Sequence, residues 1–127
     1  DYATQKAYGN GKLANILFTR ELHRRYADQG IAAVAFHPGV VATNFASDTT
    51  HLMRFAYHTP VLKHLFTISP DKSAKQLVWL AEGTPGADWQ SGDYYEKKKQ
   101  ARSNPAAHDD VLAERLWDES ARLVGLQ

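Results

Sequence analysis

The stretch "GIAAVAFHPG", residues 30–39, decides the fold class of this chain. Its apolar residues follow one another without polar alternation, which is typical of a strand buried on both faces of a parallel sheet. The Pro38–Gly39 pair then breaks the strand and turns the backbone. The preceding residues 7–28 are rich in helix formers and carry apolar side chains over a wide arc, which predicts a helix packed on two sides. A helix followed directly by a buried strand indicates an α/β fold.

The second half of the chain predicts three further elements. Residues 69–83, "SPDKSAKQLVWLAEG", predict a helix with Ser69 as its N-cap and Gly83 just beyond its end. Residues 91–98, "SGDYYEKK", predict a short strand near a sheet edge, and residues 109–124 a final helix. The side chains expected to face the core are Ala74, Leu77, Val78 and Ala81 in the first of these helices, and Leu112, Leu116 and Leu123 in the last.

Residues 44–68 fit neither a helix nor a strand pattern. This segment is too long for an ordinary connection and too apolar for a free linker. It follows the carboxyl end of the predicted strand, so we expect a substrate lid whose apolar content favours a lipophilic substrate. The competing interpretation is a pair of helices that only packs onto the core.

The composition excludes several classes of function. With 127 residues the chain suffices for one domain, and its formal net charge of +1 gives no reason to expect a nucleic-acid partner. The absence of cysteine excludes disulfides and thiolate chemistry. His51, His58 and His64 lack metal-ligand spacing, so no metal site is expected. No apolar run approaches the roughly 20 residues that span a bilayer. We therefore expect no integral membrane segment and a cytoplasmic location.

Tyr8 and Lys12 stand four residues apart in the first predicted helix. Side chains at this spacing lie one above the other on a helix, about 5–6 Å apart at Cβ. An ammonium group beside a phenol favours the phenolate, and such a phenol can donate or accept a proton at an alcohol or carbonyl oxygen. The spacing also occurs by chance, so a plain pair of surface neighbours is the competing interpretation.

The segment "HPGVVATN", residues 37–44, stands at the carboxyl end of the buried strand. In open α/β sheets, ligands bind at this edge. Pro38 and Gly39 expose peptide groups there, and Thr43 adds a hydroxyl. A plain turn at the end of a strand would account for the Pro-Gly pair as well.

Taken in order, these segments resemble the C-terminal half of a short-chain dehydrogenase/reductase, in the branch that includes retinol-dehydrogenase-like and protochlorophyllide-reductase-like enzymes. Residues 8–26, "YGNGKLANILFTRELHRRY", resemble the Tyr-x-x-x-Lys helix of that branch, and residues 30–44 its next strand and Pro-Gly loop. "SGDYY", residues 91–95, and "LWDESARLVGL", residues 116–126, resemble its last strand and last helix. The resemblance covers nearly the whole chain and implies a Rossmann-type, doubly wound parallel sheet.

The resemblance also implies an NAD(P)-dependent oxidoreductase, with NADP favoured, that interconverts an alcohol and a carbonyl. Tyr8 is then the acid/base, and Lys12 is its electrostatic partner and a ligand of the nicotinamide ribose. The Val41 backbone and the Thr43 hydroxyl are implied to hold the nicotinamide carboxamide. The residues implied to contact the cofactor are Tyr8, Lys12, Pro38, Gly39, Val41 and Thr43.

Parts of the family's pattern do not occur in these 127 residues. The glycine-rich dinucleotide turn and the catalytic serine belong ahead of the tyrosine, and Gly11 stands where the branch commonly has serine. We therefore expect a fragment of a longer polypeptide, inactive by itself and weak in binding nicotinamide cofactor. For the parent we expect a homodimer or tetramer that associates through the helix at 7–28. The alternative is a catalytically silent Rossmann-like fragment that acts as a binding or assembly module.

Overall fold

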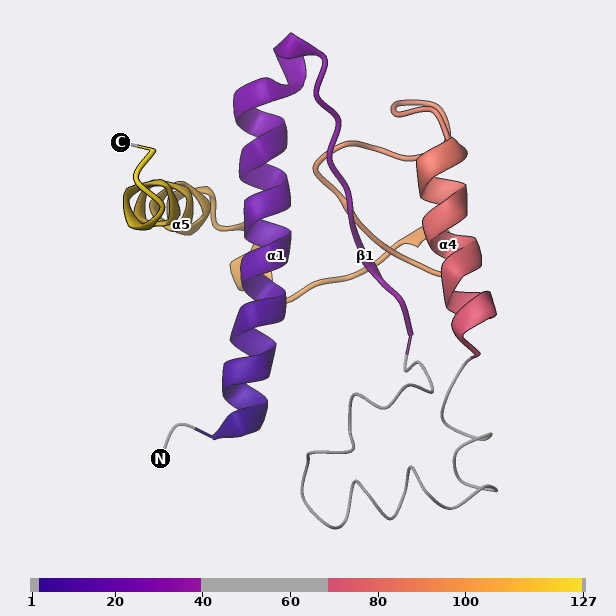
Figure 1. Ribbon diagram of the computed structural model, residues 1–127, viewed down its shortest axis with the longest axis horizontal. Helices are drawn as coiled ribbons and strands as arrows, with labels where there is room; N and C mark the ends of the chain where they lie inside the picture. Colours follow the sequence, from indigo (N-terminus) through magenta and orange to yellow (C-terminus); the bar gives the residue numbers. More distant parts are fainter. Residues whose placement is uncertain (1–2, 40–68, 127) are drawn as a thin grey trace.

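A computed structural model describes residues 3–39 and 69–126 of the chain. The helices are α1 (Thr4–Tyr26), α4 (Pro70–Glu82) and α5 (Asp110–Leu123), the strands are β1 (Ala35–His37), β2 (Tyr94–Glu96) and β3 (Lys99–Gln100), and two 3-10 helices are η1 (Ala27–Gln29) and η3 (Pro105–His108). Figure 1 shows β1 between α1 and α4. The predicted order of helix, strand, helix, strand and helix is confirmed, and the predicted lid at 44–68 lies outside the described residues. None of the described helices is long and apolar enough to cross a membrane.

α1 ends at Tyr26, two residues before the predicted end of the helix at 28, and η1 follows it as far as Gln29. Gly30 adopts a φ of +83°, a left-handed conformation that glycine reaches without a side-chain penalty. Its N–H donates to the carbonyl oxygen of Ala27 at 3.0 Å, and the Ile31 N–H donates to that of Tyr26 at 3.2 Å. These bonds satisfy carbonyl groups at the helix end and turn the chain back, so that β1 runs opposite to α1 (Figure 1).

The sheet is small and mixed. β1 pairs with β2 in parallel, with Ala35 opposite Tyr94 and His37 opposite Glu96. β2 then pairs with β3 in antiparallel orientation through a hairpin that the sequence did not predict. The parallel pair agrees with the predicted α/β class, whereas the antiparallel β3 corrects the prediction of a wholly parallel sheet. The order β1-β2-β3 makes β1 a terminal strand of the described sheet.

β1 is shorter than the predicted strand because the Ser91 side chain, and not the backbone of a neighbouring strand, bonds to the Ala33 N–H. The Ala33 N–H donates to Ser91 Oγ at 3.0 Å, and the Ser91 hydroxyl is 3.3 Å from the Ala33 carbonyl oxygen, which accepts its hydrogen. The Gly92 N–H donates to the same carbonyl at 2.8 Å. Regular pairing with β2 therefore begins only at Ala35.

The main apolar core lies between α4 and the β1–β2 pair. Leu80, Trp89 and Tyr95 are buried in it, and the partly buried Val34, Phe36 and Trp79 pack against them. The Trp89 indole N–H donates to the carbonyl oxygen of Leu80 at 3.0 Å, so this buried polar group is satisfied. Trp89 is therefore a packing residue of this core.

The predicted inward face of α4 is wrong. Leu77 and Val78 are 53% and 49% exposed, and Ala74 and Ala81 are exposed as well. The helix instead buries Leu80 and the amide of Gln76. That amide joins α4 to the main chain of β2, because Nε2 donates to the Tyr95 carbonyl at 3.4 Å and Oε1 accepts from the Lys97 N–H at 3.2 Å. A polar bridge therefore determines which face of the helix turns inward.

Both ends of α4 lie where the sequence predicted them. The C-terminal end has a glycine for its close packing and not for a left-handed conformation. Ser69 is the N-cap, and its side chain accepts a hydrogen bond from the Lys72 N–H. Gly83 is not left-handed, since its φ is −74°. A Cβ at Gly83 would lie 2.9 Å from the Trp79 carbonyl oxygen and 3.1 Å from the Trp89 ring. A glycine here lets Trp89 pack closely against the end of the helix.

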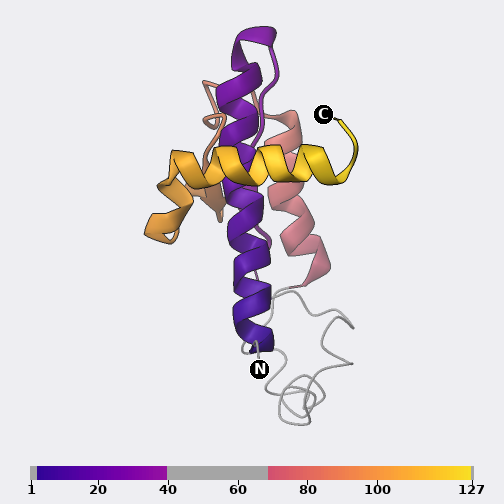
Figure 2. The ribbon, with the colours of Figure 1, turned by 90° about the vertical axis from the view of Figure 1, so that its left-hand side faces the viewer.

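α5 crosses the outer side of α1, as Figure 2 shows. Trp117 stacks on Phe18 with 5.1 Å between ring centroids and lies 5.8 Å from the Tyr26 ring. Ala113 is the buried residue of α5. The prediction that Leu112 and Leu123 face inward is wrong, because they are 36% and 70% exposed.

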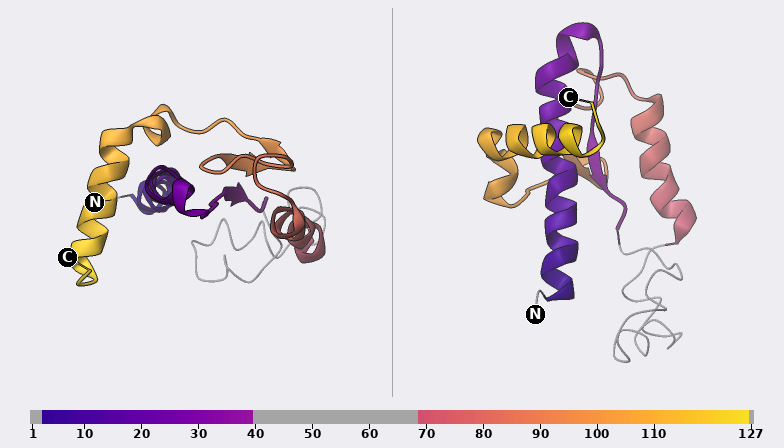
Figure 3. Two further views of the ribbon diagram at one scale, coloured as in Figure 1. Left: turned by 90° about the horizontal axis from the view of Figure 1, so that it is seen from above. Right: turned by 60° about the vertical axis from the view of Figure 1, so that its left-hand side comes forward.

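This crossing explains the wide apolar arc of α1. The arc predicted self-association through the helix at 7–28, yet α5 of the same chain covers part of it through Trp117. Figure 3 shows α5 on the opposite side of α1 from β1. The oligomeric state stays a prediction, and the covered part of α1 no longer supplies a reason for it.

The two-residue turn between β2 and β3 predicts a stabilising substitution. Lys97 and Lys98 have φ values of 51° and 62°, in a region that favours glycine and asparagine. Lys98→Gly is expected to raise the free energy of unfolding by about 1 kcal/mol, since it removes the Cβ penalty of the left-handed conformation. Urea denaturation measures this, with Lys99→Gly as the control in a strand. A gain in the control and not in Lys98→Gly would contradict the assigned turn.

Candidate active site

The start of α1 and the end of β1 lie at the same end of the molecule. Figure 1 shows α1 beginning at the end where β1 finishes, because the chain reverses at Gly30. Tyr8 and Lys12 belong to the first turns of α1, and His37 is the last residue of β1. The carboxyl end of a parallel strand is the edge at which ligands bind in such sheets.

The Tyr8 and Lys12 side chains lie on one face of α1. The Lys12 Nζ is 5.1 Å from the centroid of the Tyr8 ring, which agrees with their spacing of one helical turn. Tyr8 is 55% exposed and Lys12 is also exposed. A Cβ added at Gly9 or Gly11 would meet nothing within 4 Å, so the described structure leaves space at these two positions of α1.

The turn that follows β1 is well defined as far as Gly39. The Gly39 N–H donates to Nδ1 of the His37 ring at 2.9 Å, and Gly39 has a φ of +83°. Pro38 is exposed and Gly39 is partly buried. Val41 and Thr43, which were predicted to hold the nicotinamide carboxamide, lie outside the described residues.

These residues fit one end of a nicotinamide dinucleotide. An exposed ammonium and an exposed phenol share one face of α1, so a ribose and a planar ring could contact both. Lys12 would hold the nicotinamide ribose, and the turn at Gly39 would supply main-chain groups to the ring. The 127 residues contain no glycine-rich turn for the pyrophosphate, so the fit concerns the nicotinamide end alone.

Within residues 3–39 and 69–126, no three His, Cys, Asp or Glu side chains are grouped so that they could hold a metal ion. His51, His58 and His64 fall outside these ranges.

Trp79 packs against Tyr95, with 5.9 Å between ring centroids, as expected for a packing residue.

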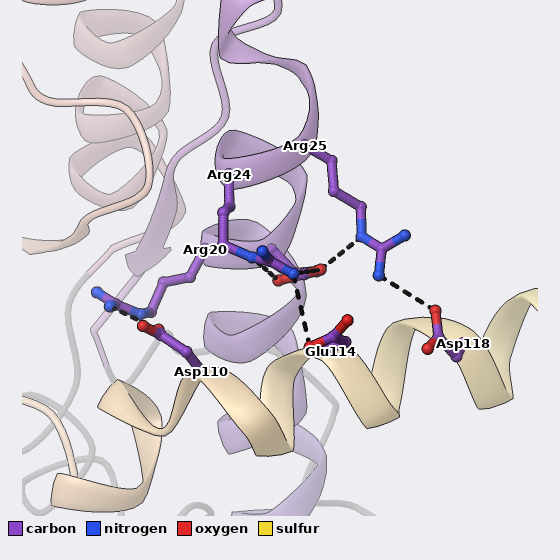
Figure 4. Close-up of polar contacts among 7 residues, drawn as sticks. Arg20, Arg24, Arg25, Asp110, Glu114 and Asp118 are labelled. Carbon is purple, nitrogen blue, oxygen red and sulfur yellow. Dashed lines mark hydrogen bonds and ion pairs between the residues drawn. The ribbon is translucent and has the colours of Figure 1, made fainter.

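A charged network farther along α1 was not predicted from the sequence (Figure 4). Glu21 is only 1% exposed, and its carboxylate accepts two hydrogen bonds from Arg24 at 2.8 and 2.7 Å and another from Arg25. Arg25 continues to Asp118 of α5 at 3.1 Å. Arg20 reaches Asp110 of α5 at 3.4 Å. The network joins α1 to α5 and lies away from Tyr8 along the helix, so we assign it a structural role.

The arginines keep Glu21 ionised. The hydrogen bond from Arg24 lowers the pKa of the Glu21 carboxyl below its ordinary value of 4.5, although burial opposes this. Arg25 lowers the same pKa through its own hydrogen bond and its charge. A spacing of Glu-x-x-Arg-Arg on a helix could have indicated local pairing. Nothing in the sequence indicated that the carboxylate would be buried by α5.

The lowered pKa predicts how stability depends on pH. Stabilisation by ionised Glu21 is fully present above about pH 4.5 and is lost as the pH falls through the lower pKa of the folded state. We expect Glu21→Gln to lower the free energy of unfolding by about 2 kcal/mol at pH 7, through loss of charged hydrogen bonds. The difference from wild type should shrink below about pH 4.5.

Urea titrations at several pH values measure this difference. Glu82→Gln on the exposed end of α4 is the matched control and should change stability little at any of them. A difference between Glu21→Gln and wild type that stays constant from neutral to acidic pH would rule out the proposed role of the charge.

Comparison with known proteins identifies relatives over nearly the whole chain. The chain is 42% identical over 129 aligned positions to human retinol dehydrogenase 13, covering 99% of this chain and 38% of the relative. Human retinol dehydrogenase 14 is 36% identical over 133 positions, covering 98% of this chain and 37% of the relative. A Streptomyces protein named as a daunorubicin C-13 ketoreductase is 35% identical over 124 positions, covering 98% of this chain and 40% of the relative.

No family model matches the chain. The chain spans about 38% of the length of the first of these relatives. The relatives are short-chain dehydrogenases/reductases, which is the family that the Tyr-x-x-x-Lys helix and the Pro-Gly turn resemble. The predicted resemblance to the short-chain dehydrogenase/reductase family is therefore confirmed by relatives at 34–42% identity over nearly the whole chain.

Proposed function

We propose that this chain carries the proton-transfer end of an NAD(P)-dependent oxidoreductase that interconverts an alcohol and a carbonyl. One observation supports this most: the Tyr8 phenol and the Lys12 ammonium share an exposed face of α1, the helix that begins at the end of the molecule where β1 finishes. The relatives named retinol dehydrogenase and ketoreductase agree with this reaction class. The cofactor is NAD(P), and we expect NADP over NAD.

Tyr8 is the acid/base in this proposal. In the reducing direction its hydroxyl donates a proton to the carbonyl oxygen of the substrate, and in the oxidising direction its oxygen accepts the alcohol proton. Lys12 lies within 5.1 Å of the ring and stabilises negative charge on the phenol oxygen. The nicotinamide cofactor, when bound, supplies or accepts the hydride.

The turn after β1 positions the cofactor. We propose that main-chain groups at Pro38 and Gly39 face the nicotinamide ring, and that the Val41 backbone and Thr43 hydroxyl hold its carboxamide. The left-handed Gly39 supports this, since a glycine allows close approach of a ligand to the backbone. Lys12 completes the contacts by donating to hydroxyl groups of the nicotinamide ribose.

The substrate is expected to be lipophilic. The apolar segment 44–68 follows this turn in sequence, and we propose that it covers the reacting end of the substrate. Relatives named for retinol and for daunorubicin are consistent with a bulky, largely apolar alcohol or ketone.

We further propose a cytoplasmic location and self-association through the part of α1 that α5 leaves uncovered.

A series of straight-chain aldehydes tests the reaction class and the substrate class together. The polypeptide used is the parent, meaning one that contains these 127 residues together with the cofactor-binding half that the family implies. We expect kcat/KM to rise with chain length, because each buried methylene contributes about 0.8 kcal/mol, and NADPH to be used better than NADH. A flat or falling series contradicts the lipophilic lid. No cofactor oxidation with any aldehyde would favour the catalytically silent module.

A further inference from the structure

The last residue of β1 holds the turn that follows it. His37 accepts a hydrogen bond at Nδ1 from the N–H of Gly39, two residues farther along, at 2.9 Å. This is the relation by which Asn and Asp side chains stabilise turns on their own backbone. With Nδ1 as acceptor, the neutral ring carries its hydrogen on Nε2.

Pro38, which lies between His37 and Gly39, makes their hydrogen bond important for the turn. Pro38 has no N–H, so Gly39 provides the first N–H donor after the strand ends. Gly39 itself can adopt left-handed and right-handed conformations with similar ease, and here its φ is +83°. The imidazole of His37 therefore selects one conformation among those open to the glycine.

The bond is local, which separates it from the stability of the sheet. His37 is exposed, and its ring nitrogen bonds to the backbone of its own turn. The pairing of His37 with Glu96 of β2 is made by the backbone and does not depend on the imidazole. Removal of the ring is therefore expected to free the turn while leaving β1 in place.

We propose that His37 is a positioning residue for the nicotinamide end of the cofactor. Its Nδ1 fixes the Pro38–Gly39 turn in the conformation that presents the main chain to the ligand, so that binding does not have to order the turn. This inference rests on the proposed function, and it adds a residue outside the Tyr8–Lys12 pair.

The test compares two substitutions at His37 in the parent polypeptide. His37→Ala removes the acceptor, whereas His37→Asn keeps an acceptor able to reach the N–H two residues on. The dissociation constant of NADPH is measured by fluorescence titration, and the thermal midpoint of each variant is measured alongside. We expect His37→Ala to weaken NADPH binding by about 2- to 10-fold, the range for loss of one hydrogen bond. His37→Asn should stay within about twofold of wild type, and the thermal midpoints should agree.

Three outcomes would overturn this assignment. Equal NADPH affinity in wild type and His37→Ala shows that the imidazole does not position the turn for the ligand. Equal losses in His37→Ala and His37→Asn show that the acceptor is not what matters. A loss of affinity that follows a loss of thermal stability assigns His37 to the fold alone. Absence of NADPH binding by wild type itself contradicts the proposed function, and the inference falls with it.

Discussion

Tyr8→Phe in the parent polypeptide is expected to lower kcat by about 10²–10⁴-fold, the usual contribution of a general acid–base. Phenylalanine keeps the ring beside Lys12 and removes only the hydroxyl that transfers the proton. Because Tyr8 is 55% exposed, its hydroxyl contributes little to folding. The dissociation constant of NADPH should therefore stay within about twofold of wild type. Steady-state kinetics with a long-chain aldehyde and a cofactor titration measure the two quantities.

Tyr26→Phe is the matched control for this substitution. Tyr26 lies on the same helix at its other end, where its ring packs 5.8 Å from Trp117. Loss of its hydroxyl should leave kcat near the wild-type value. Wild-type turnover in Tyr8→Phe would remove Tyr8 from the mechanism, and an equal loss in both variants would point to a general effect on α1.

Lys12→Ala is expected to damage both turnover and cofactor binding. The ammonium stabilises negative charge on the phenol oxygen and is proposed to donate to the nicotinamide ribose, so its removal affects both steps. We expect kcat to fall by at least about 10²-fold. The dissociation constant of NADPH should rise by about 10-fold, which is typical for loss of a charged hydrogen bond.

Lys6→Ala provides the matched control, since Lys6 is exposed on the same helix and stands outside the Tyr8–Lys12 pair. It should leave kcat and the NADPH dissociation constant close to those of wild type. A Lys12→Ala variant that loses cofactor affinity but keeps its kcat would assign the lysine to binding alone and contradict its role as partner of the phenol.

The sequence predicted where most elements lie and how they follow one another. Ser69 before Pro70 marked the start of α4, because capping is decided by residues close in the chain. The β2–β3 hairpin was missed because the local sequence of its turn carries no such signal. Lys97 and Lys98 form its turn without the Asn-Gly signal that marks such turns.

The sequence predicted the buried face of a helix less accurately than the position of the helix in the chain. The apolar side chains of α4 suggested Leu77 and Val78, yet Gln76 and Leu80 meet the core. The partners that decide this, such as Tyr95, come from a distant part of the chain. Burial of Glu21 depends in the same way on α5, whose Asp118 shares Arg25 with it.

The geometry of the Tyr8–Lys12 pair was predicted better than the packing of the helices. The spacing of Tyr8 and Lys12 gave their contact directly, since one helical turn separates them. The position of the start of α1 at the end of the molecule where β1 finishes followed from the reversal at Gly30. The bond between His37 and Gly39 was missed because histidine is not among the usual turn-forming residues. The roles of these residues stay predictions.

A crystal structure of the parent polypeptide with NADPH and an unreactive lipophilic carbonyl analogue tests the central claim most directly. The proposed function predicts that the Tyr8 hydroxyl lies about 2.6–3.2 Å from the carbonyl oxygen, the distance needed for proton transfer. It also predicts that the Lys12 ammonium contacts the ribose beside the nicotinamide. A carbonyl oxygen held by another residue, with Tyr8 facing bulk solvent, would contradict the assignment of Tyr8 as the acid/base.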